Sequence, residues 1–292
     1  MQVKKPRRRV AKKGGVLYNP VFIQYRYTMS TSTQNNNGER ERISVCIITG
    51  NEEVNIRRCL DSVKWADEIV VVDSFSTDNT VSIVLEYTDR LYQHRWLGYI
   101  GQKAVAKSLA RYEWVLFVDA DEVVSDELRR EIETLRDAGF PKDVNGYDFP
   151  RLVWFLGRWI RHGDWYPDTK LRLFRRTKGK CGGAEPHERI DIEGEPRHLK
   201  APLFHYTYDD ISDQINTLNR FSSISAEGMA SDYRSFRMLF GMLAHAPFRF
   251  FRCYIIKGGF LDGVPGLIVA VASSFGTFIK YAKRWEKVAS KD

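Results

Sequence analysis

Residues 114–122 read WVLFVDADE, an apolar run that ends in acidic residues. The unbroken apolar run predicts a buried strand, and Asp119 and Asp121 follow at its carboxyl end. Carboxylate oxygens suit a hard divalent cation such as Mg²⁺ or Mn²⁺, which can bridge a diphosphate. The alternative is an acidic turn before a helix capped by Ser125. We favour the metal site, because a buried strand delivers both carboxylates to the edge of a sheet.

Strands alternate with helices on both sides of this run. The expected elements are strands at 43–49, 68–73 and 90–93 and helices at 51–65, 78–87, 99–110 and 125–138. Ser125 is the expected N-cap of the last helix, and Gly139 stands just past its end. This alternation predicts an α/β fold with a mainly parallel sheet covered by helices on both faces.

The rest of the chain divides into three regions. Residues 1–42 are polar and basic and predict a disordered tail and linker. Within the expected catalytic domain, 43–205, the segment from 146 onward holds short strand-like runs separated by glycine and proline, which indicates a mixed sheet with functional loops. Residues 206–292 have a helical pattern rich in aromatic side chains and predict a helical C-terminal region.

Three acidic features follow predicted strands. They are Asn51-Glu52-Glu53, Asp73 and the Asp119–Asp121 pair. Ligands of open α/β sheets bind at the carboxyl ends of the parallel strands, so we expect these groups to share one site. A single acidic residue after a strand commonly caps a helix, but three at one edge favour a binding site.

Charge and cysteine content narrow the class of protein. The 292 residues carry a formal net charge of +8, with 43% hydrophobic and 28% charged residues, which excludes a wholly disordered chain. The whole excess of basic over acidic residues lies in residues 1–28, so we expect no basic face on the folded part that would bind a specific nucleic acid. The tail has three interpretations: a tether to anionic lipid or nucleic acid, a solvated extension, or a translation start at Met29. The tail lacks the long apolar core of a secretory signal. The four cysteines are scattered and lack the spacing of a zinc site. We therefore expect a cytoplasmic, reducing location.

The ordered motifs ISVCIITGNEE, EIVVVDSFSTDNT and WVLFVDADE resemble family 2 glycosyltransferases of the GT-A fold. The resemblance covers roughly residues 43–286 and includes 165–175, 185–189, 202–206 and 257–267. This fuller set resembles the bacterial β-1,4-glucosyltransferases of the lipopolysaccharide inner core. It implies an inverting transfer of a hexose, with glucose from UDP-glucose favoured, onto a heptose of a lipid-linked saccharide.

The resemblance also implies roles for single residues. The residues expected to bind the nucleotide sugar are Thr49, Asn51, Glu53, Asp73, Lys103 and Asp119. Asp121 would bind the divalent cation, and His205 would bind the same cation or the diphosphate, although a lone histidine is more often structural. Gly50, Phe75 and Asn79 depart from the usual pattern of the family, which leaves the donor preference open.

An inverting transfer needs a general base for the acceptor hydroxyl. We expect Glu188 to be this base, with Asp168 as the second candidate. The alternative for Glu188 is an ion pair with Arg189 or Arg172, and Asp168 can instead cap a turn after Pro167. Arg172 is also a candidate contact to the donor diphosphate or a phosphorylated acceptor.

The C-terminal region bears on membrane contact. The uncharged stretch 263–279 contains proline and polar residues and falls short of the about 20 apolar residues of a spanning helix. Upstream, residues 235–257 interleave aromatic residues with arginine and lysine. This mixture indicates peripheral contact with the headgroup region, at the inner face of the inner membrane; the alternative is packing on the catalytic domain.

Three rival functions remain open. The first is transfer to another envelope glycan or from another donor. The second is a nucleotidyltransferase, which the sequence TGNEE after the first strand disfavours, and the third is a non-catalytic membrane or nucleic-acid adaptor.

Overall fold

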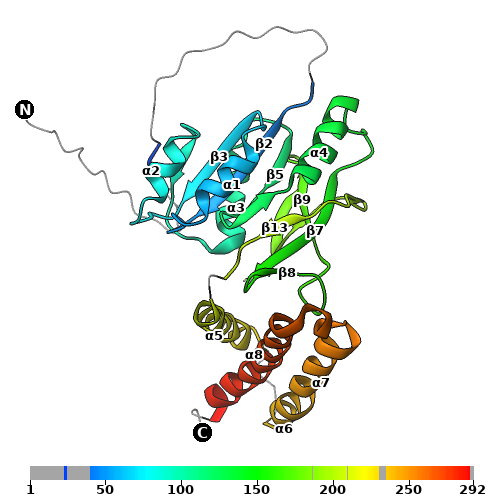
Figure 1. The fold of residues 1–292 in the computed structure, drawn as a ribbon. Coiled ribbons are helices and arrows are strands. Elements are labelled where there is room, and N and C mark those ends of the chain that lie inside the picture. Colours follow the sequence, from blue (N-terminus) through cyan, green and yellow to red (C-terminus); the bar gives the residue numbers. More distant parts are fainter. Residues whose placement is uncertain (1–22, 25–39, 186, 209, 230–234, 290–292) are drawn as a thin grey trace, which may run out of the picture.

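The computed structural model describes residues 23–24, 40–185, 187–208, 210–229 and 235–289. It consists of an α/β part and a group of helices below it, which includes α5, α7 and α8 (Figure 1). Most of the region predicted to be a tail and linker lies outside the described residues. Within that region, β1 (Ile23–Gln24) pairs with the edge strand β4.

The first half of the sheet is parallel, as predicted. Its strands run in the order β4, β3, β2, β5. The elements of this half are β2 (Ile43–Thr49), α1 (Ile56–Val63), β3 (Glu68–Asp73), α2 (Thr80–Leu85), β4 (Leu91–Gln93), α3 (Gly98–Leu109) and β5 (Trp114–Phe117). The helix expected from residue 51 begins at Ile56, because residues 51–55 form the loop that leaves β2.

The second half of the sheet is mixed. Beyond β5 the order continues as β9 (Asp168–Arg175), β7 (Gly146–Phe155), β13 (Leu203–His205) and β6 (Glu122–Val124). The contacts of β9 with β5 and β7 are antiparallel, whereas β13 runs parallel to β7 and antiparallel to β6. The short strands β8 (Arg158–Ile160) and β12 (Arg197–His198) also pair with β7, and β10 (Lys180–Ala184) forms a separate hairpin with β11 (His187–Asp191).

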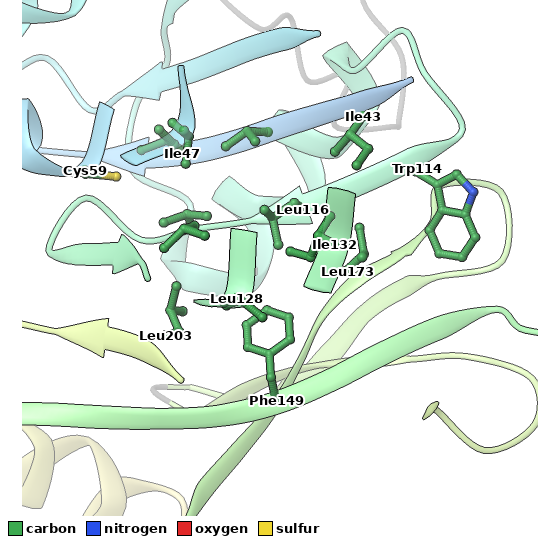
Figure 2. Packing of buried hydrophobic residues seen from close by; sticks show 14 of the residues in the cluster. Ile43, Ile47, Cys59, Trp114, Leu116, Leu128, Ile132, Phe149, Leu173 and Leu203 are labelled. Atoms are coloured by element: carbon green, nitrogen blue, oxygen red, sulfur yellow. The ribbon is translucent and has the colours of Figure 1, made fainter. Parts of the chain in front are cut away.

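Two apolar cores lie on the two faces of the sheet. Alternate residues of β2 supply them: Val45 and Ile47 face one cluster, and Cys46 and Ile48 face the other. Figure 2 shows the first cluster, where side chains of β2 and β5 meet those of α4 (Asp126–Ala138). Both faces of these strands are therefore buried, which explains their unbroken apolar sequence.

The limits of α4 are confirmed. The Ser125 hydroxyl accepts a hydrogen bond from the Leu128 amide at 3.1 Å, and Gly139 ends the helix with a φ of 77°. Asp126 and Glu127 add negative charge to the first turn, where the helix dipole favours it.

The C-terminal region is helical, as predicted. Its elements are α5 (Ile211–Glu227), α6 (Ser235–Phe240), η1 (Gly241–His245), α7 (Ala246–Phe251), η2 (Arg252–Ile256), η3 (Gly259–Asp262) and α8 (Gly263–Ala289). A third apolar cluster joins this region to the sheet, with Phe155 and Ile160 against Cys253 and Val269. At the same junction the Asp262 carboxylate accepts hydrogen bonds from the amides of residues 161 and 162.

Candidate active site

The acidic residues that follow the parallel strands lie at one edge of the sheet. Thr49 at the end of β2 is in register with Asp73 at the end of β3. The Val118 amide, just after β5, donates to the Cys46 carbonyl, so the acidic turn after β5 starts at the same edge. The edge predicted from the sequence is therefore formed.

Residues 119–122 form a tight turn between β5 and β6. The Glu122 amide donates to the Asp119 carbonyl, and the Asp119 amide donates to the Glu122 carboxylate, both at 2.9 Å. The Asp121 carbonyl accepts from the Tyr206 amide at 2.9 Å, which attaches the end of β13 to this turn. That attachment places His205 beside the acidic residues.

Asp121 and His205 form a close pair. Nε2 of His205 lies 3.0 Å from Oδ2 of Asp121, and the Thr207 hydroxyl lies within hydrogen-bonding distance of the imidazole. Burial raises the pKa of the Asp121 carboxyl, but His205 outweighs that effect and holds the pKa below its ordinary value. A carboxylate oxygen and an imidazole nitrogen at this separation can bind one cation side by side.

A second set of charges is buried behind this pair. The Lys103 ammonium lies 2.8 Å from Asp119 and 2.6 Å from Glu188, and its side chain is only 2% exposed. Arg172 lies 2.6 Å from Asp119 and 3.7 Å from Glu188. Burial raises the pKa of the Asp119 carboxyl, but Arg172 and Lys103 outweigh it and hold the pKa far below its ordinary value.

The network continues through Glu122. This fully buried carboxylate lies 3.2 Å from Arg172 and 3.3 Å from Arg151. Arg151 in turn contacts Asp168 at 2.6 Å. Asp168 also has a contact to Lys170 at the rim, at 3.0 Å.

The charge balance of this cluster fits a divalent cation. Four carboxylates, those of Asp119, Glu122, Asp168 and Glu188, pair with Lys103, Arg151, Arg172 and, at the rim, Lys170. Asp121 is a fifth carboxylate, and the described residues provide no lysine or arginine in an ion pair with it. The part of the chain that the structure describes holds no group of three or more protein ligands for a metal. Mg²⁺ and Mn²⁺ commonly bind through one or two side chains plus substrate phosphates and water, so Asp121 and His205 fit such a site. The imidazole is a softer donor than oxygen, and it therefore favours Mn²⁺ over Mg²⁺.

The other strand ends are fastened to one another. The Asn51 side chain accepts from the Thr77 amide at 2.8 Å, and Glu53 accepts from the Asn79 amide at 3.0 Å. The Asp73 carboxylate is fully buried and accepts from Ser76 and Gln93. The Thr49 hydroxyl differs, because it is buried and has no hydrogen-bond partner among the described residues.

Comparison with known proteins now places the chain in a family. The model of glycosyl transferase family 2 matches residues 44–189, which is half of the chain. A glycosyltransferase of Rickettsia typhi that has no assigned substrate is 30% identical over 254 residues, which cover 83% of this chain and 86% of the relative. The chain belongs to glycosyl transferase family 2.

Two further similarities concern this family 2 chain. The lipopolysaccharide core biosynthesis glycosyltransferase LpsC of Rhizobium meliloti is 29% identical over 256 residues, which cover 85% of this chain and 94% of the relative. The crystal structure of residues 1–349 of S. aureus TarS with UDP-GlcNAc covers 86% of this chain and 92% of that chain, with 16% identity and a TM-score of 0.41.

The predicted site residues of this family 2 transferase fall into two groups. The buried network joins the first group: Lys103, Asp119, Asp168, Arg172 and Glu188. Asp121 and His205 lie at its edge, and the second group, Thr49, Asn51, Glu53 and Asp73, lies at the ends of β2 and β3. Of the two ion pairs foreseen for Glu188, the one with Arg172 is present, whereas Arg189 pairs with Asp191 at 2.7 Å.

Glu122 and Arg151 are two members of the network that were not predicted from the sequence. Glu122 is the last residue of the motif WVLFVDADE, and its full burial gives it the central place in the network. Arg151 interrupts the apolar run of β7, and a charged side chain in an otherwise buried strand was the available signal.

Proposed function

We propose that this family 2 chain is a metal-dependent, inverting hexosyltransferase of lipopolysaccharide core assembly. It would move glucose from UDP-glucose onto a heptose of a lipid-linked inner-core saccharide. The observation that carries the proposal is the Asp121–His205 pair at the strand-end edge, beside Lys103 and Arg172. The similarity to LpsC supports the class of acceptor. The choice of glucose and of heptose rests on the motif resemblance.

Each group at the edge would have a separate task. Asp121 and His205 would hold the cation, which when bound neutralises negative charge on the departing nucleoside diphosphate. The network behind them fixes Asp119 through Lys103 and Arg172, so this carboxylate is held ready for a hydroxyl of the ribose or of the sugar. The Thr49 hydroxyl, which has no hydrogen-bond partner among the described residues, would bond the nucleotide.

Glu188 remains our first candidate for the general base. Lys103 and Arg172 fix its carboxylate at the side of the site where β11 approaches. Burial raises the pKa of Asp168, but Arg151 and Lys170 outweigh it and hold the pKa below its ordinary value. Asp168, which pairs with Arg151 and Lys170 further along the network, is the second candidate. We expect Glu188→Gln to lower kcat by about 10²- to 10⁴-fold while leaving UDP affinity near that of the wild type.

Nucleotide titration tests the proposal directly. The wild-type chain is titrated by calorimetry with UDP, UDP-glucose and ADP-heptose, with Mn²⁺ and with a chelator. Asp121→Asn should abolish the metal-dependent part of UDP binding. The matched control is Glu127→Gln, since Glu127 is an exposed carboxylate on α4 whose ion pair with Arg130 is at the surface. Binding of ADP-heptose alone would overturn the donor, and equal metal-dependent binding by Asp121→Asn would overturn the metal site.

A lipid-linked acceptor requires contact with a membrane, and we propose that the C-terminal helices provide it. By length and composition, residues 259–289 form one helical stretch that could cross a membrane. Large apolar side chains are exposed along this region, among them Phe236, Leu243, Phe248, Ile256 and Val264. Many exposed apolar side chains in one region commonly mark a membrane or partner interface.

Charge at the junction favours peripheral contact on an anionic surface. Arg249, Arg252 and Lys257 surround the single carboxylate of Asp164, which leaves an excess of positive charge beside the apolar helices. Basic and apolar groups in this combination suit the headgroup region of an anionic membrane. The proposed location is therefore the cytoplasmic face of the inner membrane.

Vesicle sedimentation tests this contact. The wild-type chain should sediment with phosphatidylglycerol vesicles more than with phosphatidylcholine vesicles, and the double change Leu243→Ser and Phe248→Ser should reduce both. The matched control is Val54→Ser, because Val54 is an equally exposed apolar residue on the α/β part. Sedimentation of the double variant at the wild-type level would refute the contact.

A further inference from the structure

Phe75 has an unfavourable position for its residue type. It lies just after β3, and its φ of 60° falls in the left-handed region, which costs a residue with a bulky side chain about 1–2 kcal/mol. Its side chain is 42% exposed, and in the described part of the chain no aromatic ring or cation stacks on it. Neither the backbone nor the packing within the protein explains a phenylalanine here.

The neighbours of Phe75 fix its position. The Ser74 amide donates to the Thr49 carbonyl at 2.8 Å, and the Ser76 amide donates to the Asp73 carboxylate at 3.0 Å. Both sides of Phe75 are therefore tied to the ends of β2 and β3. A strained backbone conformation that hydrogen bonds on both sides enforce is typical of a ligand-binding site.

A second observation points to a ligand at the same place. Thr49, next to this turn, is only 4% exposed, and its hydroxyl has no hydrogen-bond partner among the described residues. Buried polar groups are nearly always satisfied, so a buried hydroxyl without a partner among the described residues, at the strand end that holds this turn, points to a ligand with polar groups. The exposed ring of Phe75 offers the same ligand an apolar face. A planar nucleobase has both polar groups and an apolar face.

We infer that the ring of Phe75 is the surface on which the nucleobase of the donor stacks. The inference rests on the proposed function, which requires a nucleoside diphosphate at this edge, and it adds a residue that fixes the base. Stacking on an aromatic ring is tolerant of base identity, because every base has a π-face. Phe75 therefore contributes affinity for the nucleoside, while polar groups choose among bases.

The test uses a substitution whose effects on stability and on binding have opposite signs. Asn tolerates the left-handed region, so Phe75→Asn relieves strain and should not lower the midpoint of thermal unfolding. The same change removes the ring, and we expect UDP to bind about 5- to 100-fold more weakly in the presence of Mn²⁺. Inorganic pyrophosphate, which has no base, should bind the variant and the wild type equally. Phe75→Tyr retains the ring and is the matched control.

The outcomes separate the inference from the proposed function. If the wild type binds UDP and Phe75→Asn binds it equally well, the inference is wrong and the proposed function stands. If Phe75→Asn weakens UDP and pyrophosphate by the same factor, Phe75 acts on the diphosphate region and base stacking is refuted. If the wild-type chain binds none of UDP, ADP and GDP, the proposed function fails and the inference fails with it.

Discussion

Replacement of Lys103 by methionine should destabilise the fold strongly. The Lys103 ammonium lies between the carboxylates of Asp119 and Glu188, and the change removes the charge while keeping most of the side-chain volume. Loss of one partner from a buried ion pair costs about 3–5 kcal/mol. The two carboxylates are 23% and 16% exposed and Arg172 still contacts Asp119, so we expect the lower end, about 3 kcal/mol. At about 2–4 °C per kcal/mol, the midpoint of thermal unfolding should fall by about 6–12 °C.

The assay is thermal unfolding followed by circular dichroism, with Lys107→Met as the matched control. Lys107 lies one turn further along α3 and donates a single hydrogen bond to the Gly179 carbonyl, so its loss should cost about 1 kcal/mol. The double variant with Glu188→Gln should be more stable than Lys103→Met alone, because it removes one of the two carboxylates that lose the Lys103 ammonium. A fall no larger than that of Lys107→Met would refute the buried-network interpretation, and so would a double variant whose losses simply add.

Three further predictions concern other parts of the chain. Ser125→Ala should lower the stability by about 1 kcal/mol through loss of the N-cap without changing activity, as measured by urea unfolding and by turnover. Gly266→Ala should loosen the C-terminal helices, because a Cβ there would clash with the Gly259 carbonyl oxygen, and limited proteolysis should cut this region first. Burial raises the pKa of the thiols of Cys46 and Cys59, so the thiolate fraction is small at pH 8, and iodoacetamide should label both residues only in the unfolded chain.

The first half of the sheet was predictable from sequence because its information is local. Each strand of that half is short and mostly apolar, and a helix follows β2, β3 and β4 in turn. The order of β7, β13 and β6 was not predictable in the same way. Pairing between short strands that lie far apart in the chain leaves no local signal, and the position of His205 opposite Glu122 depends on that pairing.

The candidate site was predictable as a set of residues but not as a set of contacts. Asp121 and His205 were expected to act together, and they lie 3.0 Å apart. Asn51 and Glu53 were expected to line the nucleotide pocket, yet their side chains bond to the loop at residues 76–79. A polar residue that follows a strand can serve a ligand or fasten a neighbouring loop, and the sequence looks the same in both cases.

The position of β13 bears on how the enzyme is made in the cell. Asp121 and His205 are 84 residues apart in the chain, and β13 fills the space between β7 and β6. A nascent chain that has emerged only to residue 189, where the family match ends, would leave those two strands without their shared neighbour. Unpaired strand edges recruit other chains, so pausing or truncation at this point favours aggregation. Expression fragments should therefore extend beyond residue 207 to be soluble and to carry both Asp121 and His205.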